Sequence, residues 1–285
     1  MSTYWPFILN VCVMIGLPLL LARWLQARRR PGWELFGMGA LTFVLSQVGH
    51  IPFNWFVLRA ADVQAADLET WTAVFLYAAF LGLSSGLFEE VARYLTYRYW
   101  ATEARTWGRG LMLGAGHGGI EAMLVGLLAG INYVVMAGIQ RGSFLAVVPV
   151  EQLALVQAQV AAVFELPWYD VLLGGLERAF ALCLHLALSL LVMQAVLRGQ
   201  RRWVAAAVAW HALANGVAVV LVLRVNAYVA EAALAVMALL SLGIIWALRA
   251  PEPVEPELAP LPPPQPIALT QPEASAEALE RSRYS

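Results

Sequence analysis

Four apolar stretches of the chain each carry ionisable or amide side chains spaced one helical turn apart. These residues are Glu89, Glu90 and Arg93; His117 and Glu121; Glu177, Arg178, His185 and Ser189; and His211 and Asn215. Carboxylates and imidazoles together can activate water, with a glutamate as general base and a histidine or asparagine as donor to a developing oxyanion. The same residue types also bind a divalent metal, typically zinc, with a bound water as nucleophile. Either interpretation predicts a hydrolytic site.

The stretch Glu89-Glu90-Val91-Ala92-Arg93 places two carboxylates and one guanidinium on one helical face, because residues three and four apart meet there. A buried ion pair that only sets packing is the structural alternative, but it needs one glutamate. The second carboxylate is in surplus and is suited to act as a general base. We therefore expect Glu89 and Glu90 to be catalytic and Arg93 to support them.

Two stretches place a polar residue four positions after a histidine. His117 and Glu121 lie among glycines, which let another helix backbone approach closely. His211 and Asn215 have the same spacing in a purely apolar run. For the first pair the alternative is a packing motif whose His and Glu bond to each other, and for the second it is a satisfied core histidine. Three histidines beside carboxylates favour function, so we expect all four residues to be catalytic.

The remaining stretch is longer. Arg178, His185 and Ser189 share one helical face, since His185 and Ser189 follow Arg178 by about two and three turns. Glu177 and Arg178 lie nearer the outer end, where a structural ion pair explains them as well as function does. We expect His185 to be catalytic, and Arg178 and Ser189 to support the site.

The elements that must position these residues are transmembrane helices. The chain has 285 residues, of which 61% are hydrophobic and 13% charged, whereas soluble domains carry about 25% charged residues. A spanning helix needs about 20 mostly apolar residues. The runs that qualify are 4–26, 35–57, 71–98, 110–138, 170–197, 203–223 and 228–248. The sequence predicts an all-α polytopic bundle of seven helices in a lipid bilayer. Its net charge of −1 does not favour binding to nucleic acid.

Residues 1–249 are predicted to form this transmembrane domain. Between the fourth and fifth spans, residues 151–164 have helical apolar spacing and few charges, which favours a short interfacial helix. Residues 250–285 are different, because they hold nine of the 15 prolines and six of the 19 acidic residues. Such a composition cannot form a packed core, so we expect a disordered Pro/Glu-rich cytoplasmic tail.

Arginines in the short loops set the predicted orientation. The Arg-rich loops are 27–34, 99–109 and 198–202, and in a bundle of seven spans all three lie on one side. We therefore expect an integral protein of the bacterial plasma membrane, with its N-terminus outside and its tail in the cytoplasm.

The polar groups of the four spans also share a depth. With a rise of 1.5 Å per residue, they lie roughly 10–18 Å from the cytoplasmic ends of their helices. Scattered packing groups have no reason to share a level, so we predict one site in the cytoplasmic half of the bilayer. His50 lies near the outer end of the second span with Gln47 and Asn54, and we leave these residues outside the site.

The four motifs together resemble the YhfC family of intramembrane proteases. Glu-Glu-x-x-Arg, Gly-His-Gly-Gly-Ile-Glu-Ala, Glu-Arg…His…Ser and His-x-x-x-Asn occur in this order over about residues 1–250. That family is similar to a wider clan of CAAX-type (CPBP) proteases, PrsW proteases and the anterior-pharynx-defective subunit of gamma-secretase. The resemblance implies a CAAX-protease-like core and an intramembrane endopeptidase whose substrate is a membrane protein or peptide.

The resemblance also implies roles for single residues. In the clan a glutamate pair and a histidine are taken to activate water, which maps onto Glu89, Glu90 and one of His117 or His185. PrsW-like members carry a glutamate similar in position to Glu121. The His-x-x-x-Asn motif, here His211 and Asn215, is taken to support the oxyanion.

A metal mechanism and a glutamate-base mechanism both stay open, because Glu and His serve both. The cofactor of the first would be zinc or another divalent metal, with candidate ligands Glu89, His117, His185 and His211. Two other classes of protein are alternatives. One is a non-catalytic membrane scaffold or partner-binding protein related to the gamma-secretase subunit. The other is a transporter or haem protein, in which His185 and His211 would ligate the iron.

Overall fold

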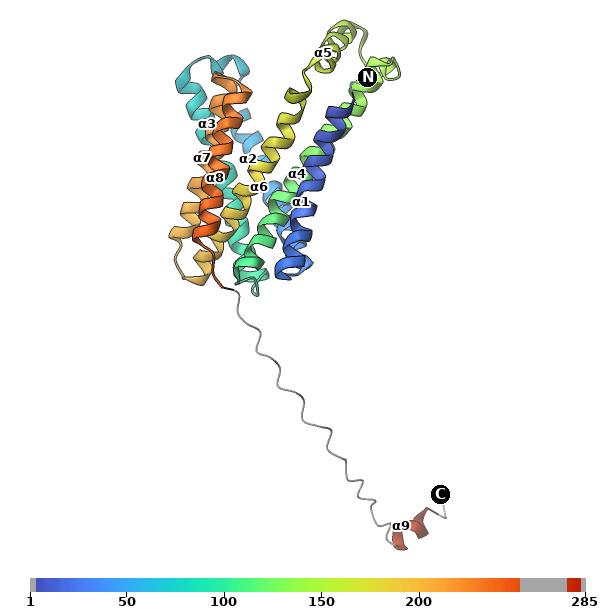
Figure 1. Cartoon of the computed structure of the whole chain (residues 1–285), viewed down its shortest axis with the longest axis vertical. Helices are drawn as coiled ribbons and strands as arrows, with labels where there is room; N and C mark the ends of the chain where they lie inside the picture. The colour runs from blue at the N-terminus through green and yellow to red at the C-terminus, as the bar shows by residue number, and fades with distance from the viewer. Residues whose placement is uncertain (1–3, 252–275, 283–285) are drawn as a thin grey trace. The chain divides into compact units, whose positions relative to one another are not determined.

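The computed structural model describes residues 4–251 and 276–282, and every regular element in these residues is helical (Figure 1). Seven helices are long and apolar enough to cross a membrane. They are α1 (Trp5–Arg29), α2 (Trp33–Ala60), α3 (Trp71–Leu95), α4 (Trp107–Gln140), α6 (Trp168–Leu197), α7 (Arg202–Arg224) and α8 (Ala227–Ala247). The prediction of an all-α polytopic bundle with seven spans is confirmed, and the chain is an integral membrane protein.

Short elements connect the spans. They are 3₁₀ turns at Ala65–Glu69, Leu145–Val147 and Val150–Gln152, a π-helical segment at Thr96–Trp100 and the helix α5 (Leu153–Glu165). The π-helical segment continues α3, so the third span extends to Trp100. The helix α5 falls on the segment predicted to form an interfacial helix, and its position at the membrane surface stays a prediction.

The chain divides into two units at residue 252. Most of the predicted tail, residues 252–275, lies outside the described residues. Further on, the short helix α9 covers Ala276–Arg281.

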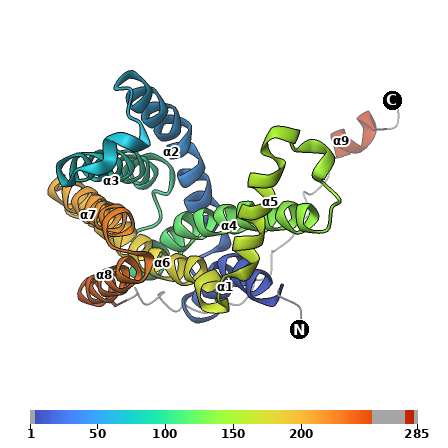
Figure 2. The same cartoon turned by 90° about the horizontal axis from the view of Figure 1, so that it is seen from above.

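Within the first unit, α6 is the most deeply buried of the seven spans. It packs against α4, α8, α1, α7 and α3, while α2 packs on α4 and α3. Seen from above, α6 lies between the pair α1 and α4 and the pair α7 and α8 (Figure 2). Polar side chains on the inner faces of α3, α4, α6 and α7 therefore share one interior.

The turn between α3 and α4 is fixed by capping bonds. Arg105 donates to the carbonyl oxygens of Tyr97 at 2.7 Å and Ala101 at 3.1 Å, near the end of the third span. Thr106 caps the start of α4, since its Oγ1 accepts from the backbone N–H of Arg109 at 3.4 Å. Satisfying the terminal backbone groups in this way fixes where α4 begins relative to α3, and thus the level of the first histidine relative to the glutamate pair.

Close helix contacts depend on glycines. A Cβ added at Gly118 of α4 would lie 2.7 Å from Cβ of His185, so the missing side chain lets α6 bring this histidine against α4. A Cβ at Gly39 of α2 would lie 2.1 Å from the backbone oxygen of Leu113 in α4. At both positions only glycine allows the observed separation of the helices.

The contact at Gly39 predicts a cost for a single methyl group. The substitution Gly39→Ala pushes a Cβ against backbone atoms that cannot move alone, and overpacking of this kind costs about 1–3 kcal/mol. The matched control is Gly37→Ala on the same helix, where an added Cβ meets nothing within 4 Å. Reversible unfolding in mixed micelles measures the difference, and equal free energies of unfolding for the two variants would contradict the packing described here.

Candidate metal and active site

The polar residues of four spans meet inside the bundle. Glu89, Glu90 and Arg93 come from α3, His117 and Glu121 from α4, Arg178 and His185 from α6, and His211 and Asn215 from α7. Most of these side chains are buried, and Glu90, Arg93 and His117 are completely so. The shared depth in the sequence therefore corresponds to a shared interior in the structure.

The two adjacent glutamates have different partners. Glu90 forms an ion pair with Arg93, three residues later on α3. Its other oxygen, Oε1, lies 2.8 Å from Nδ1 of His211 on α7. The second amino group of Arg93 lies 3.2 Å from Nδ1 of His185 rather than on Glu89. Glu89 is thus the carboxylate that Arg93 leaves uncompensated.

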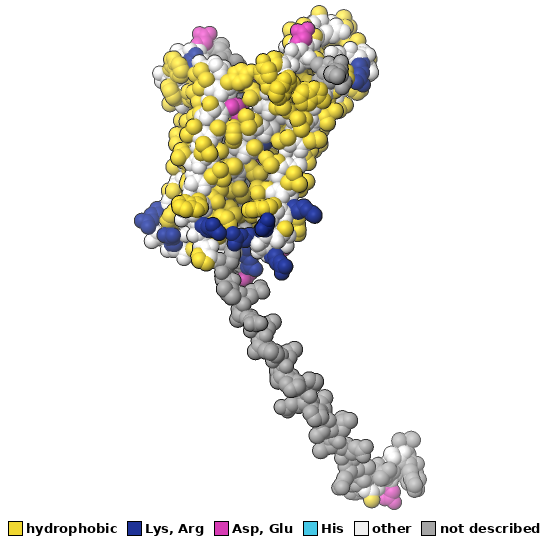
Figure 3. Space-filling model, in the orientation of Figure 1, with side chains coloured by type: hydrophobic (Ala, Val, Ile, Leu, Met, Phe, Trp, Pro, Cys, Tyr) yellow, Lys and Arg dark blue, Asp and Glu magenta, His cyan; other side chains and the backbone are white. Residues whose placement is uncertain are grey.

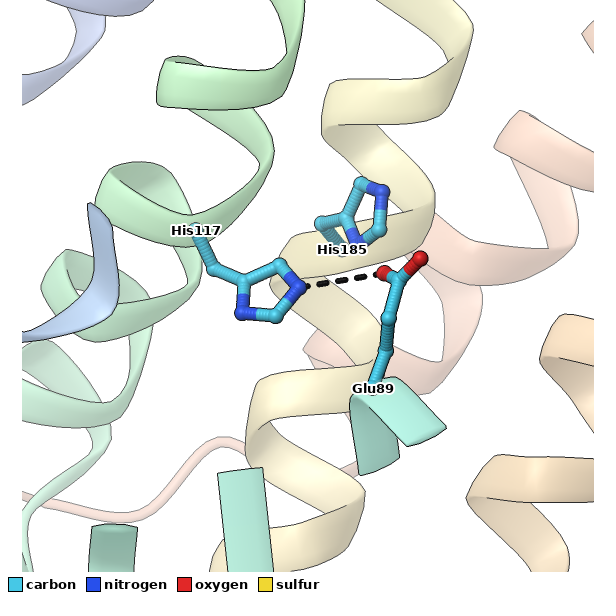
Figure 4. Close-up of side chains that lie close together, drawn as sticks. All are labelled: Glu89, His117 and His185. Carbon is cyan, nitrogen blue, oxygen red and sulfur yellow. Dashed lines mark hydrogen bonds and ion pairs between the residues drawn. The ribbon is translucent and has the colours of Figure 1, made fainter. Parts of the chain in front are cut away.

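Glu89 instead faces histidines (Figure 4). Its Oε2 lies 3.1 Å from Nε2 of His117 and 4.0 Å from Nε2 of His211. His185 projects from α6 beside them, and its ring centre lies 5.2 Å from that of His117 and 5.4 Å from that of His211. One carboxylate and three imidazoles therefore form a single cluster, which we call the Glu89 cluster.

Glu121 contacts α6 and does not bond to its helical neighbour His117. Its Oε1 accepts from Arg178 at 2.7 Å, and its Oε2 lies 2.6 Å from Nε2 of His185. Arg178 also pairs with the adjacent Glu177. The packing alternative for the glycine-rich motif, a His117–Glu121 bond, is not what the structure shows.

The partners of each ring indicate its tautomer. His211 faces a carboxylate through Nδ1, so Nδ1–H donates and Nε2 keeps the lone pair toward Glu89. At His185 the direction is opposite, because Arg93 can only donate to Nδ1, which places the hydrogen on Nε2, in ion-pair contact with Oε2 of Glu121 at 2.6 Å. Each of these rings thus has its N–H on the side that faces a carboxylate, and at His211 that N–H is hydrogen-bonded to Glu90.

Beside the cluster lies a cavity of about 70 Å³. Polar residues on its wall include Glu89, Glu121, Glu177, Arg178, His185, His211 and Asn215. Apolar side chains of α8, including Leu234 and Met237, also line the cavity. A water needs about 10–15 Å³ of such volume, so the cavity has room for water next to the carboxylates.

Two of the predicted residues have other contacts. Ser189 donates to the carbonyl of Gly110 at 2.8 Å and lies 2.7 Å from the hydroxyl of Tyr97, so it joins helices and does not contact the Glu89 cluster in the structure. Asn215 donates through Nδ2 to Ser85 at 2.8 Å while it lines the cavity.

One contact of the cluster does not follow from the sequence motifs. Gln47 of α2 donates through Nε2 to Oε1 of Glu89 at 3.2 Å. Its position in the sequence predicts that Gln47, like His50, lies toward the outer end of its span, but α2 packs against α3 where the amide reaches Glu89. An amide and an imidazole three residues apart in an apolar run were the available signal.

The donor set fits a divalent metal. Glu89, His117 and His185 each offer a buried ligand atom, and the three atoms lie within 4.8 Å of one another. Tetrahedral zinc with bonds of about 2.0–2.2 Å needs ligand atoms about 3.3–3.6 Å apart. The Nδ1 of His117 is buried with no hydrogen-bond partner, so this ring has no second bond that would compete with a ligand role. Completing such a site requires side-chain shifts that bring these atoms closer together, and His185 must also release Arg93 or Glu121.

A bundle of seven spans with a buried cluster of carboxylate and imidazole groups defines a polytopic membrane protein with a candidate metal site. The chain belongs to the YhfC intramembrane metalloprotease family, because the sequence model of that family matches residues 13–250. It is 32% identical over 250 residues to the "Uncharacterized membrane protein YhfC" of Bacillus subtilis (strain 168), covering 85% of this chain and 94% of that one. No solved structure matches the chain. The family predicted from the four motifs is confirmed, and the wider clan relation stays a prediction.

The family match and the cavity volume also bear on two alternative functions, a non-catalytic scaffold and a haem protein. A family described as proteases does not favour a non-catalytic scaffold. Sites for small molecules and cofactors usually have volumes of about 300–1,000 Å³, whereas the cavity beside His185 and His211 has about 70 Å³. A haem therefore does not fit between these two rings as they are placed.

The buried ion pair predicts an asymmetric effect of substitution. Arg93→Met leaves Glu90 as an unpaired charge in the bundle, and loss of one partner of a buried pair costs about 3–5 kcal/mol. The double variant Arg93→Met, Glu90→Leu removes both charges and is expected to lose less. Arg98→Met on the same span, with an exposed side chain, is the control and is expected to change the free energy of unfolding by less than about 0.5 kcal/mol. A double variant less stable than Arg93→Met would contradict this account.

Proposed function

We propose that the chain is an intramembrane metalloprotease that hydrolyses a peptide bond in or near the bilayer, at the Glu89 cluster. The observation that carries the proposal is the convergence of Glu89, His117 and His185, from three helices, on a volume small enough for one ion. The family description supports the reaction class. The substrate class is a membrane protein or peptide.

In this proposal Glu89, His117 and His185 would hold the metal, with His211 as a further candidate ligand. His185 would release one of its present contacts, with Arg93 or with Glu121, to free a ring nitrogen for the ion. A metal bound there, zinc or another divalent ion, supplies Lewis acidity to the scissile carbonyl and to water. Around it, carboxylates orient the rings, since Glu90 accepts from His211 and Glu121 forms an ion-pair contact with His185. Such outer partners fix the direction of a ligand's lone pair.

The remaining polar groups of the cavity have roles in proton transfer and charge. Glu121 lines the cavity, and we assign it to take the proton of the attacking water. Asn215 uses one amide hydrogen on Ser85, which leaves its second hydrogen for a developing oxyanion. Arg178 holds Glu121 in place and balances its charge.

Removal of the proposed ligands tests the function. We expect Glu89→Ala and His117→Ala to lose bound metal, measured by elemental analysis of the purified chain. We also expect them to lower the rate of cleavage of a membrane-peptide library at least about 100-fold, since the activation of water is lost. A chelator should abolish cleavage by the wild-type chain, and added zinc should restore it.

The matched control is Glu34→Gln, which neutralises an exposed glutamate outside the cluster. It should keep both the metal and the cleavage rate. Unchanged cleavage in Glu89→Ala and His185→Ala would show that the proposed site is wrong. Cleavage that continues in the presence of the chelator would instead exclude the metal mechanism and favour the glutamate-base mechanism.

We further propose that the cluster lies in the cytoplasmic half of a bacterial plasma membrane. Arginine side chains gather at one end of the helical bundle, the end opposite α5 (Figure 3). The cluster lies about 13–18 Å from the helix termini at that end. Positive loops stay in the cytoplasm, which supports an outer N-terminus and a cytoplasmic C-terminus.

Reporter fusions test this orientation. Green fluorescent protein fused after Ser285 should fluoresce, and alkaline phosphatase at the same place should be inactive. Alkaline phosphatase fused after Val225, in the turn between α7 and α8, should be active. The reverse pattern would place the Arg-rich end outside and would move the cluster to the outer half of the bilayer.

A further inference from the structure

A chain of polar side chains runs along one face of α2 and ends on Glu89. Gln47 donates through Nε2 to Oε1 of Glu89 at 3.2 Å. The Oε1 of Gln47 lies 3.0 Å from Nδ1 of His50. On the other side of this imidazole, Nε2 lies 2.9 Å from Nδ2 of Asn54 and 3.3 Å from Oγ of Ser84. These residues are distinct from the proposed metal ligands.

The hydrogen bonds of this series of side chains all have the same direction from donor to acceptor. An ionised Glu89 only accepts hydrogen bonds, so the amide nitrogen of Gln47 must face it and the amide oxygen must face His50. His50 therefore donates from Nδ1, and its Nε2 becomes the acceptor of the N–H from Asn54. Each donor points toward Glu89.

Two further contacts support this direction. The Nε2 of Gln47 also donates to Oγ of Ser46 at 3.2 Å, so both of its hydrogens have acceptors. At the far end, Oδ1 of Asn54 is buried with no hydrogen-bond partner. If every hydrogen bond of the series had the opposite direction, the Asn54 oxygen would have a partner. Oε1 of Gln47 would then face an oxygen of the ionised Glu89, and neither atom could donate. The structure keeps the orphan oxygen at the end farthest from the carboxylate.

We propose that His50 is a positioning residue that orients Glu89 through Gln47. This inference rests on the proposed function, in which Glu89 is a metal ligand. The bond from Gln47 occupies Oε1, which leaves Oε2 for the histidine side of the cluster, where His117 lies 3.1 Å away. Hydrogen-bonded partners of ligating carboxylates typically affect metal affinity or activity by 10–100-fold. His50 holds the Gln47 amide in this orientation by donating from Nδ1 to Oε1, the amide oxygen that faces away from Glu89.

The test measures the affinity of the full-length protein in detergent for Zn²⁺, by competition with a chelator, together with the rate constant for peptide cleavage. We expect Gln47→Leu and His50→Phe to raise the dissociation constant for zinc by about 10–100-fold. His50→Gln should stay within about threefold of wild type, because an amide can both accept from Asn54 and donate to Gln47. This rescue would not occur if the ring only filled space.

Thr42→Val is the matched control. Thr42 also joins α2 to the third span, through a buried bond of 2.7 Å to Thr96, but it makes no contact with the Glu89 cluster in the structure. It should lower stability without changing the affinity for zinc. If His50→Phe does not fold, Asn54→Leu replaces it, and the lost donor should raise the dissociation constant by about threefold.

The failures are distinguishable. If Gln47→Leu and His50→Phe bind zinc as Thr42→Val does, while Glu89→Ala does not bind it, the positioning role is wrong and the proposed function stands. If Glu89→Ala binds zinc like wild type, the proposed site itself is wrong. A wild-type chain that binds neither zinc nor another divalent metal overturns both.

Discussion

The ion pair between Glu90 and Arg93 is the interaction on which the rest of the site depends. Both side chains are completely buried, and each reaches a second helix, since Glu90 contacts His211 of α7 and Arg93 contacts His185 of α6. A charge inside a bilayer is costly unless it is paired and hydrogen-bonded. The pair therefore stabilises the packing of three helices and also sets the direction of two imidazoles.

Because Arg93 pairs with Glu90, the adjacent Glu89 has no arginine partner. Glu89 emerges on the same helix one residue earlier, about 100° around the axis, and so faces α2 and α4 instead. Its partners are an amide and imidazoles, which are polar but carry no fixed positive charge. A carboxylate in such surroundings is compensated best by a cation, and this is why the electrostatics of the cluster agree with a metal site.

The seven spans and the level of the site could be predicted because they follow from fixed geometry. Segment length against bilayer thickness gives the spans, and a constant rise per residue gives the shared depth of His117, His185 and His211. Which glutamate pairs with which histidine could not be predicted. It depends on the rotation of each helix about its own axis, which the glycine contacts set, and those contacts join residues far apart in the chain.

Gln47 and Ser189 both show that the depth of a residue along its helix does not determine whether it belongs to the site. Distance from the helix end indicates depth but not direction, so Ser189 shares a face with His185 and still bonds to Gly110 and Tyr97, where α6 meets its neighbours. The position of Gln47 in the sequence predicts that it lies outside the site, yet α2 packs against α3 where the Gln47 amide reaches Glu89. Tertiary crossing points, rather than periodicity, decide membership of the site.

The size of the cavity finally constrains how a peptide could be hydrolysed there. About 70 Å³ holds water but not a peptide segment. Water can thus reach the carboxylates in the described arrangement, whereas access of a scissile bond requires that a wall of the cavity move. The ion-paired helices α3, α6 and α7 are held together by buried charges, whereas the wall residues of α8 are apolar. Displacing α8 breaks no ion pair of the cluster, so the apolar wall has the lowest electrostatic cost of opening.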